Sequence, residues 1–315
     1  MEEPMREIKK VFVAGSGTMG MSIAQAFAGK GYEVTVFDIF EEAIEKGKKL
    51  LHLNQEALII SGKSTEEKSA QVIANISFTT DLEAAKDTDF VTESVVEKLE
   101  IKRDFWGKIS NIVEDDVLLT TNTSGLSITA IAEAVNKPER FVGMHWFNPP
   151  HIIPLIEVIN GDKTDDANAQ EVYELSKALG KQPIRVKKDV PGFCANRVQF
   201  TVLRELLHLV EDDVVSCEDA DNVMKYGLGI RYACLGPFEI ADMGGIDTFR
   251  NISDYLFADL DNNQDGSPLF RSLVEQGRLG VKAGAGIYEY ADGKADIAIK
   301  ERDEKYMKVV DVLGI

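Results

Sequence analysis

A glycine-rich segment near the N-terminus constrains the fold more than any other feature of the chain. It is Val11-Phe-Val-Ala-Gly15-Ser-Gly17-Thr-Met-Gly20, a G-x-G-x-x-G spacing directly after an apolar strand. In this spacing Gly15 permits a tight turn, Gly17 lets the backbone approach a pyrophosphate, and Gly20 lets the following helix pack against the strand. The segment therefore predicts a dinucleotide-binding βαβ unit.

The residues around this motif extend the predicted cofactor site. Thr18 and Met19 open the helix, whose free N–H groups and dipole favour a pyrophosphate. The second predicted strand ends at Asp38. A carboxylate at this position accepts hydrogen bonds from the ribose hydroxyls and repels a 2′-phosphate, so we expect NAD rather than NADP.

Strand and helix patterns alternate through the first part of the chain. We expect helices over 18–30, 41–74 (as two helices) and 166–179. We expect strands over 11–15, 33–37, 76–79, 90–95, 117–121, 141–146, 156–159 and 184–187. This alternation predicts an α/β fold, a doubly wound Rossmann-type parallel sheet with helices on both faces.

The pattern changes near Asp189-Val190-Pro191-Gly192. After it the chain is helical, with helices expected over 194–211, 217–226, 247–256 and 267–276. We therefore predict two domains, an NAD-binding domain over 1–188 and an all-α C-terminal domain over 189–315 that contributes to substrate binding and dimerisation.

Composition excludes several classes of function. The net charge of −18 argues against nucleic acid as a partner. No apolar run approaches the roughly 20 residues of a membrane helix, and the N-terminus lacks a signal-peptide pattern. The three cysteines are dispersed and have no CxxC pair, so we expect neither a disulfide framework nor a metal site. A reducing cytoplasm is the expected compartment.

Two residues stand out as candidate catalytic groups. His145, one of four histidines, lies near the end of an apolar predicted strand, where parallel sheets face their ligand crevice. Its side chain type suits a general base near neutral pH. Glu157 lies in the otherwise apolar run Ile152-Ile-Pro-Leu-Ile-Glu-Val-Ile-Asn, where a buried carboxylate needs a partner. A histidine could supply that partner.

Several further segments carry a family resemblance. In order and spacing, they are similar to those of 3-hydroxyacyl-CoA dehydrogenases, from about residue 8 to Tyr290. The segments are Asn122-Thr-Ser-Gly-Leu-Ser-Ile-Thr, Gly143-Met-His-Trp-Phe-Asn-Pro-Pro, Pro154-Leu-Ile-Glu-Val-Ile, Pro191-Gly-Phe-Cys-Ala-Asn-Arg and Gly280-Val-Lys-Ala-Gly-Ala-Gly-Ile-Tyr-Glu-Tyr.

The resemblance implies an activity and the roles of its catalytic residues. It implies an enzyme of fatty acid metabolism that oxidises (S)-3-hydroxyacyl-CoA with NAD, most similar to 3-hydroxybutyryl-CoA dehydrogenases. His145 would take the proton of the substrate's 3-hydroxyl, and Glu157 would orient it. Ser124 and Asn196 would contact the substrate. From the residues alone, Ser124 could equally be a turn residue and Asn196 a helix cap.

The resemblance also implies contacts around the cofactor. Glu97 and Lys102 match positions that contact it, although from the residues alone they could be surface charges of a helix. Asn122 and Asn148 match positions that line the nicotinamide and the active site, and Asn148 is expected at the substrate.

One departure from the family pattern bears on the substrate. Arg231 and Tyr232 stand in Gly227-Leu-Gly-Ile-Arg-Tyr-Ala-Cys-Leu-Gly-Pro-Phe-Glu, where the family has a simpler apolar segment. This is more similar to the L-gulonate 3-dehydrogenase (lambda-crystallin) and carnitine dehydrogenase branches, which act on free hydroxy acids. Arg231 could bind a substrate carboxylate, or it could form a structural ion pair. The alternative to an acyl-CoA substrate is thus a free 3-hydroxy acid.

Two more hypotheses concern the protein as a whole. The resemblance implies a homodimer, and the helix expected over 194–211 carries an apolar face that suits one, although a helix bundle within one chain would explain the same face. A cofactor-binding structural or sensor protein is the third function considered. The presence of His145, Glu157, Ser124 and Asn196 together argues against it.

Overall fold

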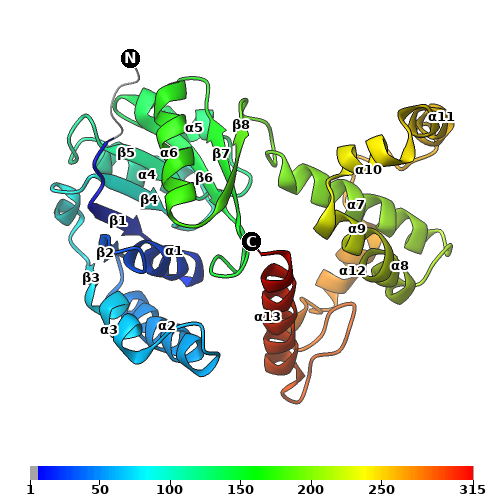
Figure 1. The fold of residues 1–315 in the computed structure, drawn as a ribbon, viewed down its shortest axis with the longest axis horizontal. Coiled ribbons are helices and arrows are strands. Elements are labelled where there is room, and N and C mark those ends of the chain that lie inside the picture. The colour runs from blue at the N-terminus through cyan, green and yellow to red at the C-terminus, as the bar shows by residue number, and fades with distance from the viewer. Residues whose placement is uncertain (1–5, 315) are drawn as a thin grey trace. The chain divides into compact units, whose positions relative to one another are not determined.

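The structure is a computed structural model that describes residues 6–314. The chain divides into two compact units between Asn196 and Arg197 (Figure 1). The sequence places the boundary near 188, but in the structure the segment before Arg197 belongs to the first unit. Contacts of Ala195 and Asn196, described below, explain this difference.

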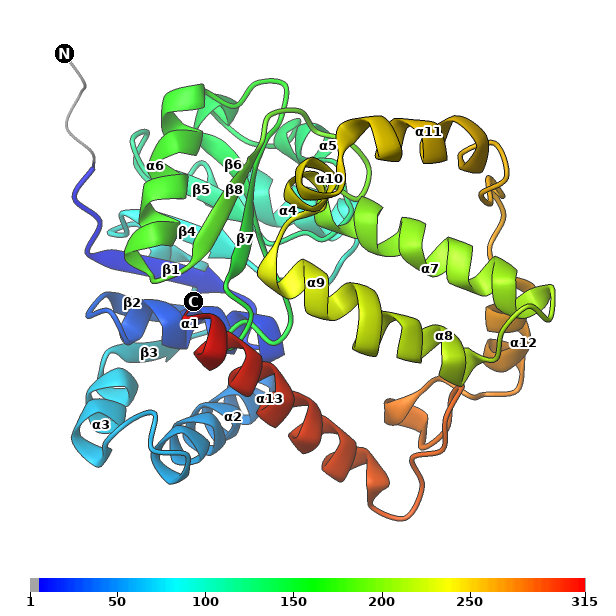
Figure 2. The same cartoon turned by 45° about the vertical axis from the view of Figure 1, so that its right-hand side comes forward.

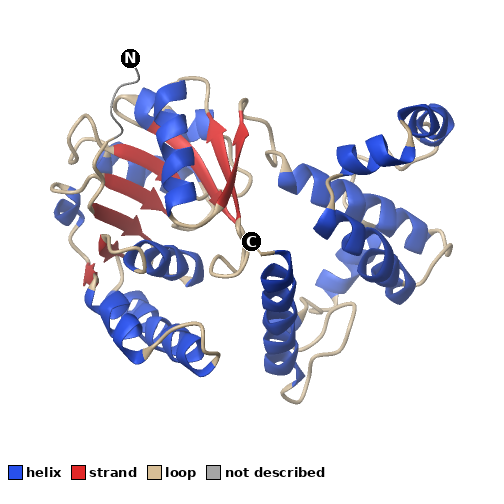
Figure 3. Cartoon of the chain, in the orientation of Figure 1, coloured by secondary structure: helices blue, strands red, loops and turns tan. Residues whose placement is uncertain are grey.

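Within the described residues, eight strands of the first unit form one sheet in the order β3-β2-β1-β4-β5-β6-β7-β8 (Figure 3). The strands are β1 (Lys10–Ala14), β2 (Glu33–Phe37), β3 (Ile76–Thr79), β4 (Phe90–Glu93), β5 (Leu118–Thr121), β6 (Phe141–Trp146), β7 (Leu155–Asn160) and β8 (Gln182–Val186). The predicted α/β fold with a Rossmann-type sheet is confirmed.

Helices cover both faces of this sheet. The helices of the first unit are α1 (Thr18–Ala28), α2 (Glu41–Ile60), α3 (Glu66–Ala74), α4 (Leu99–Ile109), α5 (Ile128–Ala132) and α6 (Asp166–Ala178). Residues of α1, α2 and α6 form one buried apolar cluster with the sheet, and residues of α4 and α5 form a second. The sequence patterns did not single out α4 and α5. Among the described residues, no helix is long and apolar enough to span a membrane.

One strand departs from the parallel sheet that the sequence predicts. β7 is antiparallel to β6, whereas every other neighbouring pair is parallel. The reason is the short connection over 147–154, because a parallel crossover needs a dozen or more residues. The antiparallel register places His145 directly opposite Glu157.

The second unit is helical. It contains the rest of α7 (Ala195–Glu211), then α8 (Cys217–Val223), the π-helix η3 (Met224–Leu228), α9 (Gly229–Cys234), α10 (Pro237–Gly244), α11 (Ile246–Leu256), α12 (Pro268–Glu275) and α13 (Lys294–Leu313). α8, η3 and α9 follow one another as one continuous helical segment (Figure 2). The sequence patterns predicted α7, α8, α11 and α12, but not α9, α10 or α13.

Candidate active site

The glycine loop between β1 and α1 has the geometry that its spacing predicts. Gly15 has a φ of 101°, and a Cβ there would lie 2.6 Å from the Ser94 carbonyl oxygen. A Cβ on Gly20 would lie 1.9 Å from the carbonyl oxygen of Gly15. At Gly17, by contrast, a Cβ would meet no described atom within 4 Å. The loop is therefore closed on the protein side and open where a ligand would lie.

The N-terminus of α1 also fits a pyrophosphate. Its N-cap, Gly17, makes no side-chain capping hydrogen bond, so the first N–H groups of the helix are available to an anion. Asp38, just after β2, accepts hydrogen bonds on Oδ2 from the Ser16 N–H (3.0 Å) and the Ser16 hydroxyl (2.8 Å). The carboxylate therefore lies beside the glycine loop, as expected for a group that binds the adenosine ribose.

The contrast between the two glycines gives a prediction. Gly17→Ala should fold with unchanged stability, because φ at Gly17 is −72° and the space is open, but NAD affinity should fall about tenfold or more because the methyl group occupies the phosphate side. Gly20→Ala should instead lower the free energy of unfolding by about 1–3 kcal/mol. Calorimetric titration and chemical denaturation would measure both, and a stability loss in Gly17→Ala with normal NAD affinity would contradict the assignment.

His145 and Glu157 form a buried pair across the neighbouring strands β6 and β7. The His145 Nδ1 lies 2.8 Å from Glu157 Oε2, and the residues are 5% and 0% exposed. The antiparallel pairing of β6 with β7 brings them together. An ionised carboxylate can only accept a hydrogen bond, so Nδ1 carries the proton and the lone pair of the neutral ring lies on Nε2. This is the tautomer that a general base at Nε2 requires.

The other oxygen of Glu157 binds the start of α7. Oε1 accepts hydrogen bonds from the backbone N–H groups of Cys194 (3.0 Å) and Ala195 (2.9 Å). Burial raises the pKa of Glu157, but the hydrogen bonds from His145, Ala195 and Cys194 outweigh it, so the pKa is lowered. Glu157 is therefore ionised at neutral pH, and it connects the histidine to α7.

Two aromatic rings pack against the imidazole. The ring centroids of Phe147 and Phe193 lie 4.4 and 5.8 Å from that of His145. Phe193 is buried and has a φ of 52°, which is costly for a bulky side chain. The sequence reasoning missed Phe193, and its signal would have been its place directly after Gly192. These rings limit the orientations that His145 can adopt.

The candidate substrate residues lie on segments that adjoin this pair along the chain or bond to those segments. Asn196, at the start of α7, donates from Nδ2 to the carbonyl oxygen of Ser124 (2.8 Å). Asn122 Oδ1 accepts from the Trp146 N–H (2.8 Å), so its side chain links the ends of β5 and β6. Ser124 and Asn148 are exposed on loops that follow β5 and β6. Within the first unit, the structure thus links the loops that follow β5 and β6 with the first residues of α7.

Glu97 and Lys102 belong to a polar network with a residue that sequence reasoning missed. The Lys102 ammonium lies 2.5 Å from Glu93 Oε1 and 3.2 Å from Glu97 Oε2. Glu97 Oε1 in turn accepts the Ser124 N–H (2.9 Å). Glu93 ends β4, and a carboxylate closing an apolar strand was the signal that could have identified it. Cofactor contacts by Glu97 and Lys102 stay a prediction.

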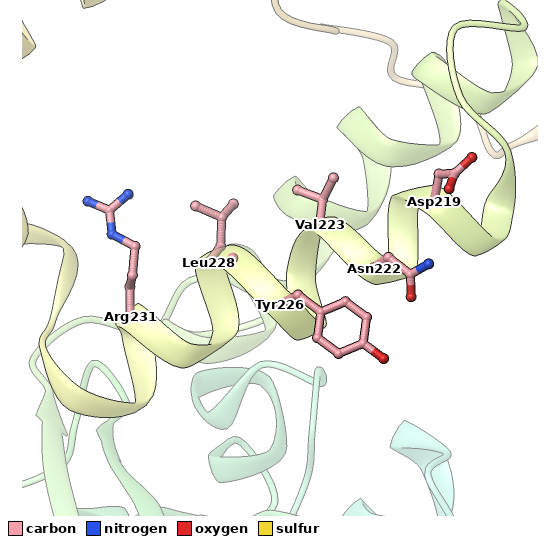
Figure 4. Close-up of a pocket in the computed structure, with 7 residues that line it drawn as sticks. Asp219, Asn222, Val223, Tyr226, Leu228 and Arg231 are labelled. Carbon is pink, nitrogen blue, oxygen red and sulfur yellow. The ribbon is translucent and has the colours of Figure 1, made fainter.

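Arg231 belongs to the second unit. It is exposed and lines a shallow pocket of about 560 Å³ on the α8–α9 segment, together with Asp219 and Tyr226 (Figure 4). Within residues 6–314, Arg231 forms no ion pair with a carboxylate, so the structural ion pair considered above is absent there. Tyr232 is also exposed. No group of three or more His, Cys, Asp or Glu side chains among the described residues could hold a metal ion.

Comparison with known families assigns both parts of the chain. Residues 10–190 match the family model described as 3-hydroxyacyl-CoA dehydrogenase, NAD binding domain. Residues 192–290 match the model of the 3-hydroxyacyl-CoA dehydrogenase C-terminal domain. The helix α13 lies beyond both matched ranges.

Individual relatives point to two kinds of substrate. The chain is 36% identical over 307 residues to a 5-formyl-3-hydroxy-2-methylpyridine 4-carboxylate 5-dehydrogenase of Mesorhizobium japonicum, covering 97% of this chain and 98% of that protein. A crystal structure of an enzyme of the same name, described as an NAD⁺-dependent dismutase, has a TM-score of 0.91 at 35% identity, covering 98% of this chain and 99% of that one. The chain is also 36% identical over 282 residues to a 3-hydroxybutyryl-CoA dehydrogenase of Clostridioides difficile, covering 89% and 99%.

Proposed function

This chain belongs to the 3-hydroxyacyl-CoA dehydrogenase family of NAD-dependent oxidoreductases, and on that premise we propose that it interconverts (S)-3-hydroxyacyl-CoA and 3-oxoacyl-CoA. Short acyl chains such as 3-hydroxybutyryl are the proposed substrates. The observation that carries the proposal is the buried contact of 2.8 Å between His145 Nδ1 and Glu157 Oε2, which leaves Nε2 as a base.

The proposed mechanism assigns one task to each residue. His145 Nε2 accepts the proton of the 3-hydroxyl while the C3 hydride departs and the C–O bond becomes a carbonyl. Glu157 stabilises the imidazolium that results, because its charge is held beside Nδ1. The Ser124 hydroxyl donates to the substrate oxygen. Asn196 fixes the Ser124 loop through its carbonyl, and Asn148 borders the site.

NAD supplies the hydride acceptor when it is bound. The uncapped helix, the open face at Gly17 and the carboxylate of Asp38 fit this cofactor. We propose that the residues holding it are Gly15, Gly17, Thr18, Met19, Gly20, Asp38, Glu97, Lys102 and Asn122.

A substrate panel tests the proposed function. Purified protein should oxidise NADH in the presence of acetoacetyl-CoA and reduce NAD with (S)-3-hydroxybutyryl-CoA, and it should show little activity with the corresponding free acids. Protein that binds NADH but does not oxidise it with any 3-oxoacyl-CoA would refute an acyl-CoA substrate.

A free carboxylic acid is the second candidate substrate. Two observations favour it: one relative that matches nearly the whole chain, over nearly its own full length, is named for a pyridine carboxylate, and Arg231 has no carboxylate partner within residues 6–314. A guanidinium free of protein carboxylates is able to bind a substrate carboxylate by two hydrogen bonds.

Substitution of Arg231 separates the two candidates. If the substrate is a free acid, Arg231→Met should raise its KM about tenfold or more, because a charge-assisted contact is lost. Lys225→Met is the matched control, since Lys225 lies on the same helical segment and already pairs with Asp221. An unchanged KM for the best acid in the panel would reject this role for Arg231.

We also propose a homodimer formed through the second unit. Among residues 197–314, the only buried hydrophobic residues are Ala220 and Ile240. Large apolar side chains are exposed on its helices, at Val198, Phe200, Phe238, Ile246, Phe249, Ile252 and Val312. So much exposed apolar surface on one unit favours a protein interface that covers it.

Light scattering coupled to size exclusion should therefore give twice the chain mass. Phe200→Asp should shift the mass towards the monomer, because it places a charge on the apolar face of α7. Ile60→Asp, at an exposed apolar position of α2 in the first unit, should leave the mass unchanged. A monomeric wild type at micromolar concentration would refute the dimer.

A further inference from the structure

We propose that Glu93, the buried carboxylate that ends β4, is a positioning residue that orders the loop over 122–125 through Lys102 and Glu97. The inference rests on the proposed function in one respect, because that loop carries Ser124, the proposed contact of the substrate oxygen. The link consists of two carboxylates and one ammonium that lead from the sheet to the loop.

Glu93 is the inner end of this link. It is 0% exposed, and four donors surround it. Oε1 accepts from the Lys102 ammonium (2.5 Å) and the Val95 N–H (2.8 Å). Oε2 accepts from the Thr121 hydroxyl (2.7 Å) and the Trp106 indole N–H (3.2 Å). Every group in contact with the carboxylate donates a hydrogen bond. The site therefore suits an ionised carboxylate, which can only accept hydrogen bonds.

Lys102 is the middle of the link. Its side chain is 1% exposed, and the ammonium contacts three oxygen atoms of the protein. These are Glu93 Oε1 at 2.5 Å, Glu97 Oε2 at 3.2 Å and the Val95 carbonyl oxygen at 3.4 Å. Two of these contacts are ion pairs with carboxylates, so the ammonium bridges Glu93 and Glu97. Through these contacts Lys102 acts on Glu97.

Glu97 is the outer end, and it binds the loop. Its side chain is 41% exposed. Oε1 lies within hydrogen-bond distance of the Thr123 hydroxyl (2.5 Å), the Ser124 N–H (2.9 Å), the Gly125 N–H (3.3 Å) and the Ser124 hydroxyl (3.4 Å). Burial raises the pKa of Glu97, but the Thr123 hydrogen bond and the charge of Lys102 outweigh it, so the pKa is lowered. One carboxylate oxygen thus holds three consecutive loop residues.

The charge of Lys102 explains how Glu93 affects the position of Glu97. Glu93 fixes Lys102 in one position, and Lys102 then holds Glu97 Oε2 so that Oε1 faces the loop. Without Glu93, the ammonium is free to turn wholly to Glu97 and draw it away from the loop N–H groups. A displacement of Ser124 by about 1 Å is enough to lower the rate by roughly 100-fold in a preorganised site.

The same contacts could serve only the stability of the sheet, and the two roles predict different results. A stabilising ion pair affects unfolding but not one loop in the folded protein. If Glu93 instead positions the loop, its substitution should change the exchange of the loop amides, and it should have no further effect on kcat once Glu97 has been replaced. The coupling between Glu93 and Glu97 is therefore the quantity to measure.

The experiment uses Glu93→Gln, Glu97→Gln, the double variant and Glu100→Gln as the control. Glu100 is exposed on the same helix, α4, two residues before Lys102 and on a different side of the helix. Hydrogen–deuterium exchange is measured on each full-length protein without ligand. Steady-state kinetics are measured with the best substrate of the panel.

In Glu93→Gln, the Ser124 and Gly125 amides should exchange about tenfold faster, while amides of β1 and β2 keep their protection. Its kcat should fall roughly tenfold, and adding Glu93→Gln to Glu97→Gln should change kcat less than about twofold. Glu100→Gln should match the wild type. Unchanged exchange at Ser124 and Gly125, or equal losses of kcat in both backgrounds, would overturn the proposal.

In Glu93→Gln alone, the buried Lys102 ammonium loses this carboxylate partner, which could prevent folding. In that case the double variant Glu93→Gln/Lys102→Met replaces it, because it removes both buried charges together. It should show the same faster exchange at Ser124 and Gly125, and normal exchange there would overturn the proposal. The exchange data do not depend on catalysis. A wild type inactive on the whole substrate panel would refute the proposed function and leave this comparison intact.

Discussion

A His145→Gln variant is expected to fold and bind NAD like the wild type but to lose about three orders of magnitude in kcat, within the usual range for removal of a general base. A glutamine amide can still donate a hydrogen bond to Glu157, so the buried carboxylate keeps a partner. It cannot accept a proton at the position of Nε2, so the hydroxyl proton has no acceptor. Single-turnover NADH formation and NAD titration measure the two properties separately.

His52→Gln provides the control for this experiment. His52 is exposed on α2, in the same unit as the site, and should tolerate the change with normal kcat. If His145→Gln retained the kcat of the wild type, the sensor hypothesis would be revived and the proposed base would be rejected.

A Glu157→Gln variant is expected to lower kcat by roughly three to four orders of magnitude, comparable with other triads in which the orienting carboxylate becomes an amide. The amide oxygen can still accept the N–H groups of Cys194 and Ala195. The amide NH₂ then faces Nδ1 of His145, which favours the ring tautomer with its proton on Nε2. The base is therefore blocked, and the charge that stabilises imidazolium is also lost.

The pH dependence of stability offers a second measurement on Glu157→Gln. The pKa of Glu157 is lowered in the folded protein, so its ionised form stabilises the fold above the ordinary value of 4.5. That contribution is lost as the pH falls from this value through the lowered pKa. The wild-type free energy of unfolding should thus fall more steeply below pH 4.5 than that of the variant. Parallel curves would show that Glu157 is not held ionised by its contacts.

The kinetic control for Glu157 is another carboxylate of the same unit. Glu171→Gln, on α6 in the same unit, removes a carboxylate that binds Arg6 near the surface. It should leave kcat unchanged. Normal kcat in Glu157→Gln would instead show that His145 keeps its tautomer without the carboxylate.

The nucleotide-binding half could be predicted in detail because its signals are local. The spacing of Gly15, Gly17 and Gly20 requires a turn between a strand and a helix, and the structure contains that turn. Asp38 follows the next strand, and the pairing of β2 with β1 brings it back to the loop. Short-range spacing and parallel pairing of successive strands are enough for this result.

Other features lacked such signals. The helix α4 has a charged residue, Lys102, at one of its buried positions. A lysine at a core position is indistinguishable from a surface charge until its partner is known. That partner, Glu93, lies on a strand, and no periodic pattern connects the two residues. The apolar residues of the second unit were visible in the sequence, but no local pattern shows what covers them.

The pair of His145 and Glu157 separates what the sequence predicts from what only the tertiary structure decides. The sequence by itself singled out these two residues as a candidate pair, because histidine is rare in this chain and an acidic residue in an apolar run needs a partner. Only the tertiary structure decided how they meet: the antiparallel β7 places Glu157 opposite His145, and the start of α7 holds the second carboxylate oxygen. The direction of a strand and the contacts between distant segments depend on how the whole chain folds back on itself. Local residue patterns do not encode this.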